Sequence, residues 1–379
     1  MALQERKRRT LIASLLFIAC SRILVSSALA ASANDAVFNA KQEAQVRGKV
    51  FITTHEEIVS KAKAEGKLRV MTGLLGSVKT TTEAFKKKYP FIDLQRIETI
   101  RSADNAQQAF LEMKAGTGKD WDIARTYTDQ YNEYLPHLWK IDLLGMAEQG
   151  VIEVPPKMID PTNRNVIALL SRFQITAYNK NLVPPNRVPK TWEDILKPEF
   201  KGRQFAAEIR SQELAALVPA WGLEKTLDYA SKVAAQQPIW VRGGTRGISS
   251  VLGGEIPMYL GPNYSSVKGV QRKDPLGVLQ YVVLEPVPVR VGTEQAILAT
   301  SKNPHAALLW LEFMASREAQ SLIDQHEPLA SSFHVRGSAV EQELRGKKLS
   351  VVSWDENDKM EQWIAAIVKA FGFPRAESK

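Results

Sequence analysis

The sequence predicts an α/β protein with more than one domain, and three observations support this fold class. Segments with strand character alternate with segments of helical periodicity between residues 67 and 124, and the alternation returns between residues 191 and 260. Such alternation is typical of a mostly parallel sheet with helices on its faces. The chain has 379 residues, of which 44% are hydrophobic, and this length suits two hydrophobic cores.

The first part of the chain provides strands and helices in strict alternation. We expect a strand at 67–71, a helix at 78–88, a strand at 91–97, a helix from Ser102 to Gly116 and a strand at 121–124. Pro90 stops the first of these helices, and Ser102 has the side chain of an N-cap for the second. Apolar residues recur at helical spacing on one face of the second helix, at Ala106, Ala109, Phe110 and Met113.

The later elements follow the same pattern. They are helices at 191–196, 214–218 and 227–234, strands at 239–241 and 256–260, and helices at 303–315 and 360–371. Asp194 stands three residues after Thr191, which is the spacing of a capping box, so the helix at 191–196 has a defined start. Pro304 is well placed at the first turn of the helix at 303–315.

Two extended stretches mark where the chain crosses between domains. Residues 166–178 carry little charge, and two prolines disfavour helix within residues 285–293. Two crossings make the first lobe discontinuous in sequence. We therefore expect a signal peptide at 1–30, an N-terminal extension at 31–64, a first lobe from 65–170 plus 290–379, and a second lobe at 171–289.

The N-terminus has the pattern of a signal peptide. Basic residues at 6–9 precede a short apolar run at 11–19, and the small residues at 28–30 fit a signal-peptidase site. The apolar run is shorter than the roughly 20 residues that span a bilayer, so we expect a periplasmic protein. The pair at 8–9 also resembles a twin-arginine signal, and Cys20, the only cysteine, ends a lipobox-like segment. Export route and lipid anchoring stay open.

The composition excludes several functional classes. The formal charge is +9, of which the first 30 residues carry +4, and no dense basic stripe with interleaved aromatics indicates nucleic-acid binding. The positive balance favours an anionic ligand. Neither a G-x-S-x-G elbow nor an H-E-x-x-H motif occurs, so we expect a protein that is not an enzyme and has no cofactor or metal site. We also expect a monomer.

The candidate ligand-binding residues of the first lobe follow its strands. Ligands of α/β sheets bind beyond the carboxyl ends of strands, where helix N-termini favour anions. The three loops concerned provide Thr72 and Gly73, then Arg101 and Ser102, then Thr126. Arg101 has the planar guanidinium that binds a carboxylate or phosphate through two hydrogen bonds.

The second lobe offers a similar turn. Arg242, Thr245 and Arg246 follow the strand at 239–241 and surround a pair of glycines, which suits a small oxyanion. Tyr264 is expected to stack on the ligand or to bind it through a hydrogen bond. Tyr178 lies in the first crossing stretch and has the same potential role.

Several runs resemble the bacterial extracellular solute-binding proteins of ABC importers. The resemblance covers most of residues 65–330, and it is carried by the runs AYNKNLV at 177–183, PKTWEDIL at 189–196, RGGT at 242–245 and AALLWLEFMASREAQ at 306–320. It implies a type II periplasmic-binding-protein fold, with two α/β lobes joined by a hinge of two crossing strands. It also implies a ligand in the cleft, closure of the lobes, and docking on a membrane permease.

The resemblance is to the branch that holds ferric-binding and related anion-binding proteins. Its ferric members carry adjacent tyrosines as iron ligands, whereas the matching segment here, residues 263–266, contains Tyr264 alone. A small anionic solute, such as a carboxylate, phosphonate or oxyanion, is therefore the expected ligand. The alternatives are ferric iron or a ferric chelate, and a ligand sensor partner or a secreted enzyme on the same fold.

Overall fold

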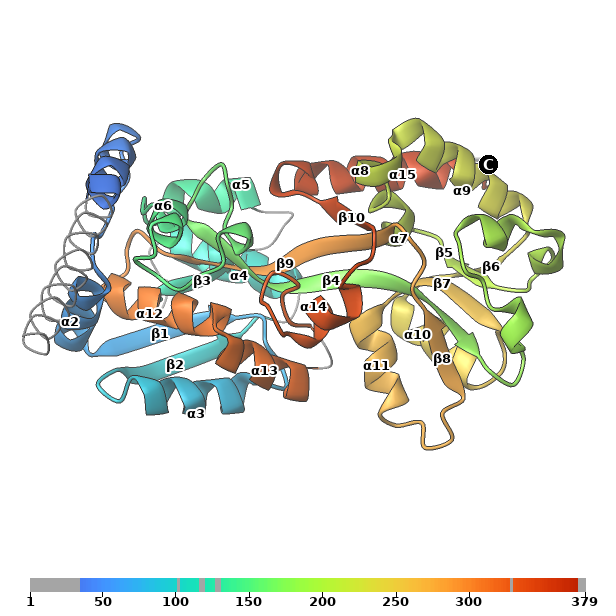
Figure 1. The fold of residues 1–379 in the computed structure, drawn as a ribbon, viewed down its shortest axis with the longest axis horizontal. Coiled ribbons are helices and arrows are strands. Elements are labelled where there is room, and N and C mark those ends of the chain that lie inside the picture. The colour runs from blue at the N-terminus through green and yellow to red at the C-terminus, as the bar shows by residue number, and fades with distance from the viewer. Residues whose placement is uncertain (1–34, 101–102, 116–119, 127–130, 328–329, 374–379) are drawn as a thin grey trace, which may run out of the picture.

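The computed structural model describes residues 35–100, 103–115, 120–126, 131–327 and 330–373. These residues form an elongated molecule of two lobes that lie end to end and are joined by two long strands (Figure 1). Residues 35–46 are helical and precede the first lobe. None of the described helices is both long and apolar enough to cross a bilayer.

One sheet runs through both lobes. Its strand order within the described residues is β2-β1-β3-β9-β4-β7-β5-β6, while β10 pairs with β9 and β8 pairs with β4. The strands are β1 (Lys67–Thr72), β2 (Asp93–Thr99), β3 (Ile123–Thr126), β4 (Val166–Asn179), β5 (Ala206–Glu208), β6 (Ile239–Val241), β7 (Met258–Asn263), β8 (Leu279–Val282), β9 (Val287–Ile297) and β10 (Leu349–Val352).

The hinge is the antiparallel pair of β4 and β9. Their register runs from Val166 opposite Ala296 to Phe173 opposite Val289, and both strands continue from one lobe into the other (Figure 1). The expected crossing stretches at 166–178 and 285–293 match these two strands. The predicted α/β fold with two lobes and a hinge of two crossing strands is therefore confirmed.

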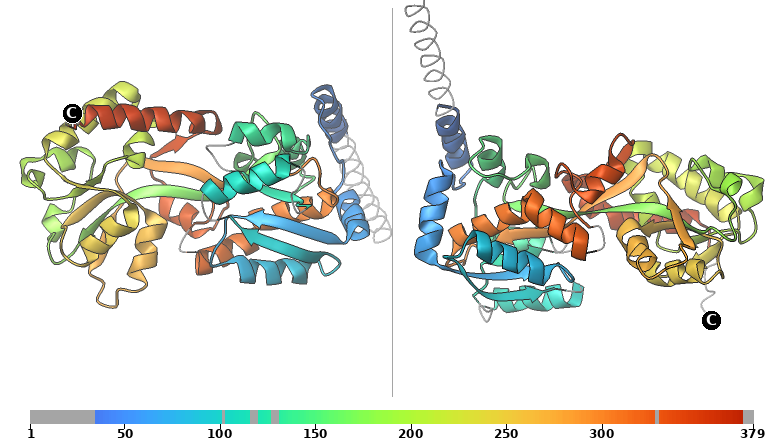
Figure 2. Two further views of the ribbon diagram at one scale, coloured as in Figure 1. Left: turned by 180° about the vertical axis from the view of Figure 1, so that it is seen from behind. Right: turned by 60° about the horizontal axis from the view of Figure 1, so that its bottom comes forward.

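Helices cover both faces of the first lobe, as the view from behind shows (Figure 2). Phe85 of α3 packs edge-to-face on Trp310 of α12, with ring centroids 5.1 Å apart, on one face. Phe110 of α4 packs on the opposite face in a separate core. The helices of this lobe are α2 (His55–Glu65), α3 (Val78–Lys88), α4 (Ala103–Lys114), α5 (Tyr131–Tyr134), α6 (Leu143–Glu148), α12 (Pro304–Ala315) and α13 (Arg317–His326).

The second lobe is built in the same way. One face of its sheet carries α10 and α11, and the other carries α7, α9 and α15. The helices here are α7 (Gln212–Ala215), α8 (Val218–Trp221), α9 (Leu223–Ala235), α10 (Gly244–Leu252), α11 (Tyr264–Gln271) and α15 (Met360–Ala370), with α14 (Ala339–Leu344) beside the hinge. The short 3-10 helices are η2 (Leu135–His137), η3 (Pro156–Met158), η4 (Pro185–Arg187), η5 (Glu193–Leu196), η6 (Pro198–Phe200) and η7 (Trp354–Lys359).

The packing of the C-terminus differs from the expectation. We expected all of 290–379 to lie with the first lobe, but α15 buries Trp363, Ile364 and Ile367 in a core of the second lobe. The reason is its apolar face, which fits against α7 and α9 (Figure 1). The chain therefore returns to the second lobe at α14, whose Val340 and Leu344 are buried in the core with α10 and α11. The other expected domain limits stay predictions.

The helix expected at 191–196 is shorter and tighter than predicted. Its capping box forms as expected, since Thr191 Oγ1 accepts from Asp194 N–H at 3.2 Å and Asp194 Oδ2 accepts from Thr191 N–H at 2.9 Å. However, only the 3-10 turn η5 follows. Pro198 disfavours helical backbone at the residue before it, so the turn has no room to extend.

Candidate functional site

The strand directions bring two carboxyl edges face to face. The strand β9 runs from the second lobe into the first and is antiparallel to both β3 and β4. The strands β5, β6 and β7 are parallel to one another, and β7 is antiparallel to β4. The carboxyl ends of β5–β7 therefore point toward the first lobe, and those of β1–β3 point toward the second. Ligands of open α/β sheets bind at such edges.

Two of the helix N-termini predicted to bind an anion already hold a carboxylate of the protein. Glu327 Oε1 accepts from the N–H of Leu75 and, at 3.0 Å, from the N–H of Ser77, at the start of α3. Glu208 accepts from Gly243 N–H at 3.0 and 3.2 Å, at the start of α10. At α3 the carboxylate takes two of the N–H groups that sequence reasoning assigned to a ligand, and at α10 it takes the one of Gly243.

The predicted residues of the first lobe lie at its carboxyl edge. Thr72 is fully buried and accepts from Leu74 N–H at 3.3 Å. Gly73 leaves room for a neighbouring side chain instead of a ligand, because a Cβ there would lie 2.5 Å from Arg125 Nε. Thr126 is fully buried at the end of β3. The predicted Arg101 and Ser102 lie outside the described residues.

The predicted residues of the second lobe do not gather at one point. Arg242, Thr245 and Arg246 are exposed around the start of α10. Tyr264 is buried: its ring stacks on Phe173 at 4.4 Å, and its hydroxyl hydrogen-bonds Glu343 Oε2 at 3.1 Å.

Tyr178 is also distant from the carboxyl edges. It lies near the end of β4, opposite Met258, which is the first residue of β7. Because β7 points toward the first lobe, this end of the pair is the far one, and Tyr178 packs there against the core of the second lobe. Ligand contacts by Tyr178, Tyr264 and the residues of α10 stay predictions.

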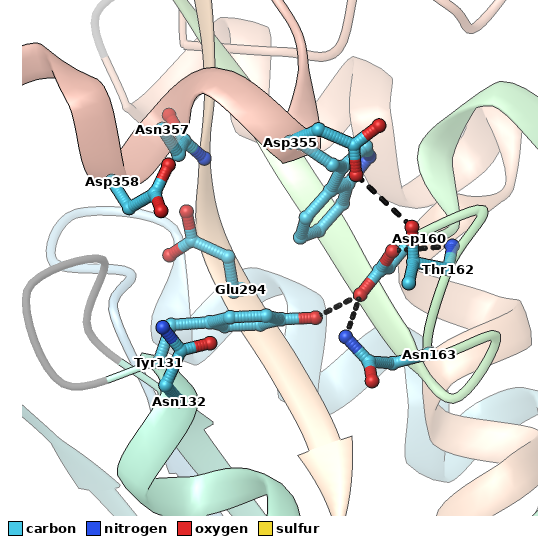
Figure 3. Close-up of a pocket in the computed structure, with 10 residues that line it drawn as sticks. Tyr131, Asn132, Asp160, Thr162, Asn163, Glu294, Asp355, Asn357 and Asp358 are labelled. Carbon is cyan, nitrogen blue, oxygen red and sulfur yellow. Dashed lines mark hydrogen bonds between the residues drawn. The ribbon is translucent and has the colours of Figure 1, made fainter.

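A polar cavity of about 270 Å³ lies beside the hinge (Figure 3). We call it the acidic pocket. Its walls come from α5, the loop before β4, β9 and η7. They consist of Tyr131, Asn132, Asp160, Thr162, Asn163, Glu294, Trp354, Asp355, Asn357 and Asp358.

Hydrogen bonds organise one wall of the acidic pocket. Asp160 accepts from the Tyr131 hydroxyl and from Asn163 Nδ2, the latter at 2.8 Å (Figure 3). The Thr162 hydroxyl donates to Asp355 Oδ1 at 3.0 Å. This last bond joins the first lobe to η7, which leads directly into α15 of the second lobe. The pocket therefore lies where the two lobes approach each other.

Two aromatic side chains of the pocket, from α5 and η7, lie close together and pack against the same core of the first lobe. The rings of Tyr131 and Trp354 have centroids 6.0 Å apart at an angle of 45°. Burial raises the pKa of the Tyr131 hydroxyl well above its usual range, and the hydrogen bond to Asp160 raises it further. Tyr131 therefore stays protonated and donates to Asp160 across the physiological range of pH.

Three arginines affect the pKa of Glu294, the residue of β9 that lines the pocket. Glu294 is 3% exposed, and this burial raises the pKa of its carboxyl. The positive charges of Arg172, Arg125 and Arg290 act in the opposite direction and favour the carboxylate. Arg172 of β4 and Arg290 of β9 occupy opposite positions in the ladder of the hinge strands. The Arg290 side chain also donates a hydrogen bond to Gln212 of α7 at 3.2 Å.

The pocket has the chemistry of a binding site for a positive charge. It presents carboxylates from Asp160, Glu294, Asp355 and Asp358, and among the described residues that line it there is no lysine or arginine. Within the described part of the chain, no three His, Cys, Asp or Glu side chains converge as metal ligands do. The carboxylates are thus distributed over the walls and do not form a single coordination sphere.

Sequence reasoning missed this pocket because its residues come from four distant segments. No motif links Tyr131, Asp160, Glu294 and Asp355, and only the fold brings them together. One signal was present: the segment WDENDK at 354–359 concentrates acids just before an apolar helix. Acids in that position are also typical of an ordinary helix start, so composition alone does not identify a site.

Comparison with a family model gives a match over most of the chain. Residues 80–330 match the model described as bacterial extracellular solute-binding protein. This range includes α3 to α13 and both hinge strands. No curated protein sequence matches the chain with significance.

Solved structures with the same fold include several ferric-binding proteins. The apo ferric ion-binding protein A of Pasteurella haemolytica has a TM-score of 0.60 at 16% identity, covering 82% of this chain and 100% of that one. The Trichodesmium protein IdiA (FutA), in complex with iron and citrate, scores 0.57 at 16% identity, covering 81% and 98%. The Bordetella ferric binding protein scores 0.57 at 20% identity, covering 80% and 98%.

Proposed function

Because the chain belongs to the bacterial extracellular solute-binding proteins, we propose that the acidic pocket holds the solute and that the solute is positively charged. As a family member, the protein is the solute-binding component of an ABC transporter and acts outside the cytoplasm. It delivers a small ligand to a membrane permease. The charge of the pocket walls is the observation that carries the finer proposal.

The side chains of the pocket suit an ammonium group or a metal ion. The carboxylates accept hydrogen bonds from N–H donors, and such charge-assisted bonds are roughly twice as strong as neutral ones. A cation near the rings of Tyr131 and Trp354 gains further attraction from their π-systems. A cavity of about 270 Å³ has room for a small organic cation or a hydrated ion.

Closure of the lobes completes the site in this proposal. Tyr131, Asp160 and Thr162 belong to the first lobe, and Trp354 packs against the same core as Tyr131. Asp355 and Asp358 lie on η7, which leads into α15 of the second lobe. Bending of β4 and β9 would separate the two sets and break the hydrogen bond between Thr162 and Asp355. A cation held between them favours the closed form, because it binds both sets only in that form.

Ferric iron is one form of this cationic solute, and the similar structures favour it. Carboxylate and phenol oxygens are hard donors that suit Fe(III). The distributed carboxylates and the buried, hydrogen-bonded Tyr264 speak against a cage made only of protein ligands. A ferric ion would therefore bind together with a small chelator.

An anionic solute is the second candidate function, and the hinge arginines favour it. Arg125, Arg172 and Arg290 lie close enough to Glu294 to affect its pKa, and they give the floor of the site a positive component. Of the N–H groups that would support them, those of Leu75 and Ser77 at α3 are bound to Glu327, and that of Gly243 at α10 is bound to Glu208. The acidic walls are the observation that favours a cation over an anion in this proposal.

The experiment uses Tb³⁺ as a probe of the pocket. Tb³⁺ is a hard cation that prefers oxygen ligands, and its emission increases when an excited tyrosine or tryptophan lies nearby. We expect sensitised emission with the wild-type protein. Replacing two wall carboxylates, in the double variant Asp355→Asn with Asp358→Asn, weakens binding by at least about 100-fold, since each of the two lost bonds to a charged group contributes about 1.5–3 kcal/mol.

A matched control separates the pocket from general surface charge. Asp228→Asn removes an exposed carboxylate on α9 and leaves Tb³⁺ affinity unchanged. In parallel, thermal unfolding is measured with spermidine, with citrate and with phosphate. Stabilisation by the amine that is lost in the double variant supports the proposal. Stabilisation by citrate or phosphate alone, unaffected by the double variant, refutes it in favour of an anionic solute.

A further inference from the structure

The second lobe contains a group of buried oxygen atoms that no described residue satisfies. They are the carboxyl Oε1 of Glu213, the amide oxygens of Gln174 and Asn263, and the hydroxyl oxygen of Thr176. We call these atoms the oxygen cluster. Buried polar atoms nearly always have a hydrogen-bond partner, so several unsatisfied oxygens in one place require an explanation.

The fold brings these oxygens to one place. Gln174 of β4 is directly opposite Asn263 of β7 in the antiparallel ladder, so the two side chains lie on the same face of the sheet. Thr176 lies two residues further along β4 and therefore points to that face as well. The helix α7, which carries Glu213, packs on β7 from the same side.

Gly261 makes room for the carboxyl of Glu213. A Cβ at this position would lie 2.1 Å from Glu213 Cδ and 2.6 Å from its Oε1. Gly261 lies in the irregular part of β7, between Leu260, which is opposite Thr176, and Asn263, which is opposite Gln174, so the carboxyl is held between these two pairs. Its φ of +86° is one that residues with a side chain rarely adopt.

Among the described residues, no lysine or arginine contributes to the pKa shift of Glu213 in the oxygen cluster. Glu213 is 2% exposed, and burial raises the pKa of its carboxyl to about 8. The other charge of the described residues that contributes to this shift is Glu208, which is also negative. Ser211 hydrogen-bonds the carboxyl but brings no charge. A buried carboxylate in these surroundings requires either a proton or a cation.

We propose that the oxygen cluster is a binding site for a small monovalent cation such as Na⁺ or K⁺. Its donors are one carboxylate, two amide carbonyls and a hydroxyl, which is the all-oxygen set that hard cations prefer. One positive charge balances the single carboxylate and leaves the buried site neutral. This site is separate from the acidic pocket, and the proposal does not depend on the nature of the transported solute.

The test compares thermal unfolding in NaCl, KCl and choline chloride at equal ionic strength and at pH 9. At this pH the carboxyl of Glu213 is mainly ionised, so cation binding does not compete with a proton. Glu208 of β5, Tyr259 of β7 and Tyr229 of α9 also face this carboxyl, and all three are kept. We expect a higher melting temperature in NaCl or KCl than in choline chloride.

Two variants and one control assign this effect to the oxygen cluster. Glu213→Gln keeps the shape but removes the charge, so the difference between the salts disappears. Thr176→Val removes one donor and reduces the difference. Glu193→Gln, on the exposed surface of the same lobe, retains it in full. Equal melting temperatures of the wild type in all three salts, or an unchanged salt response in Glu213→Gln, overturn the proposal and leave a bound proton as the explanation.

Discussion

Replacing Gly261 by alanine tests the packing of the second lobe at its most crowded point. The added Cβ would lie 2.1 Å from Glu213 Cδ and 2.2 Å from Glu213 Cγ, far inside van der Waals contact. Glu213 is fully enclosed, so its side chain has little room to retreat. The left-handed backbone at Gly261 adds a second, independent cost.

The magnitude follows from these two terms. A residue with a side chain costs about 1–2 kcal/mol in the left-handed region. Overpacking a filled core costs typically about 1–3 kcal/mol more. Gly261→Ala should therefore lower the free energy of unfolding by about 2–5 kcal/mol. Gly254→Ala provides the matched control, because its φ of +78° gives the backbone cost while the nearest atom to a new Cβ is 3.8 Å away.

Urea unfolding monitored by circular dichroism measures both variants against the wild type. We expect Gly261→Ala to be the less stable of the two by the overpacking term. Adding Glu213→Ala to Gly261→Ala should restore that part of the stability, because the clashing atoms are removed. Equal destabilisation by the two glycine variants, with no recovery in the double variant, would refute the packing described here.

Further predictions concern pH and buried networks. Burial raises the pKa of the Glu213 carboxyl from about 4.5 to about 8. Its contribution to stability is therefore full below pH 4.5 and is lost as the pH rises to about 8. Glu213→Gln should remove this loss of stability when unfolding is measured against pH in choline chloride. Burial lowers the pKa of His334 from 6.5 to about 4, so stability falls as pH drops through this window, and His334→Gln should unfold less readily in acid than the wild type. Asp122 is fully buried and accepts from Arg69 N–H at 2.9 Å and from the Ser301 hydroxyl at 2.7 Å, so Asp122→Ala should lower the urea midpoint through a loss of about 2–4 kcal/mol.

Local sequence signals predicted the main elements of the fold. The helix expected at 78–88 and the two crossing strands appear at the expected places because short-range periodicity, proline and capping residues determine them. The short strands β5, β8 and β10 were not predicted. Each has three or four residues, too few for an alternating pattern to stand out, and each depends on a neighbour that is distant in sequence.

The site was harder to predict than the fold. The sequence predicted that arginines and helix N-termini lie at the carboxyl ends of the strands. In the structure, these strand ends face each other from the two lobes. It did not foresee that Glu208 and Glu327 would bind the free N–H groups, because each carboxylate reaches its helix from a distant segment. The acidic pocket likewise depends on the return of the chain through η7, which the assignment of 290–379 to the first lobe did not include.

The identity of the solute tests the central claim most directly. Native mass spectrometry of the freshly purified protein measures the mass of any solute that it retains. If the acidic walls select the solute, the bound species is an organic cation or a metal ion, alone or with its chelator, and it is lost when Asp355 and Asp358 are both replaced by asparagine. A retained phosphonate, carboxylate or oxyanion that survives this double replacement would contradict the assignment of the pocket.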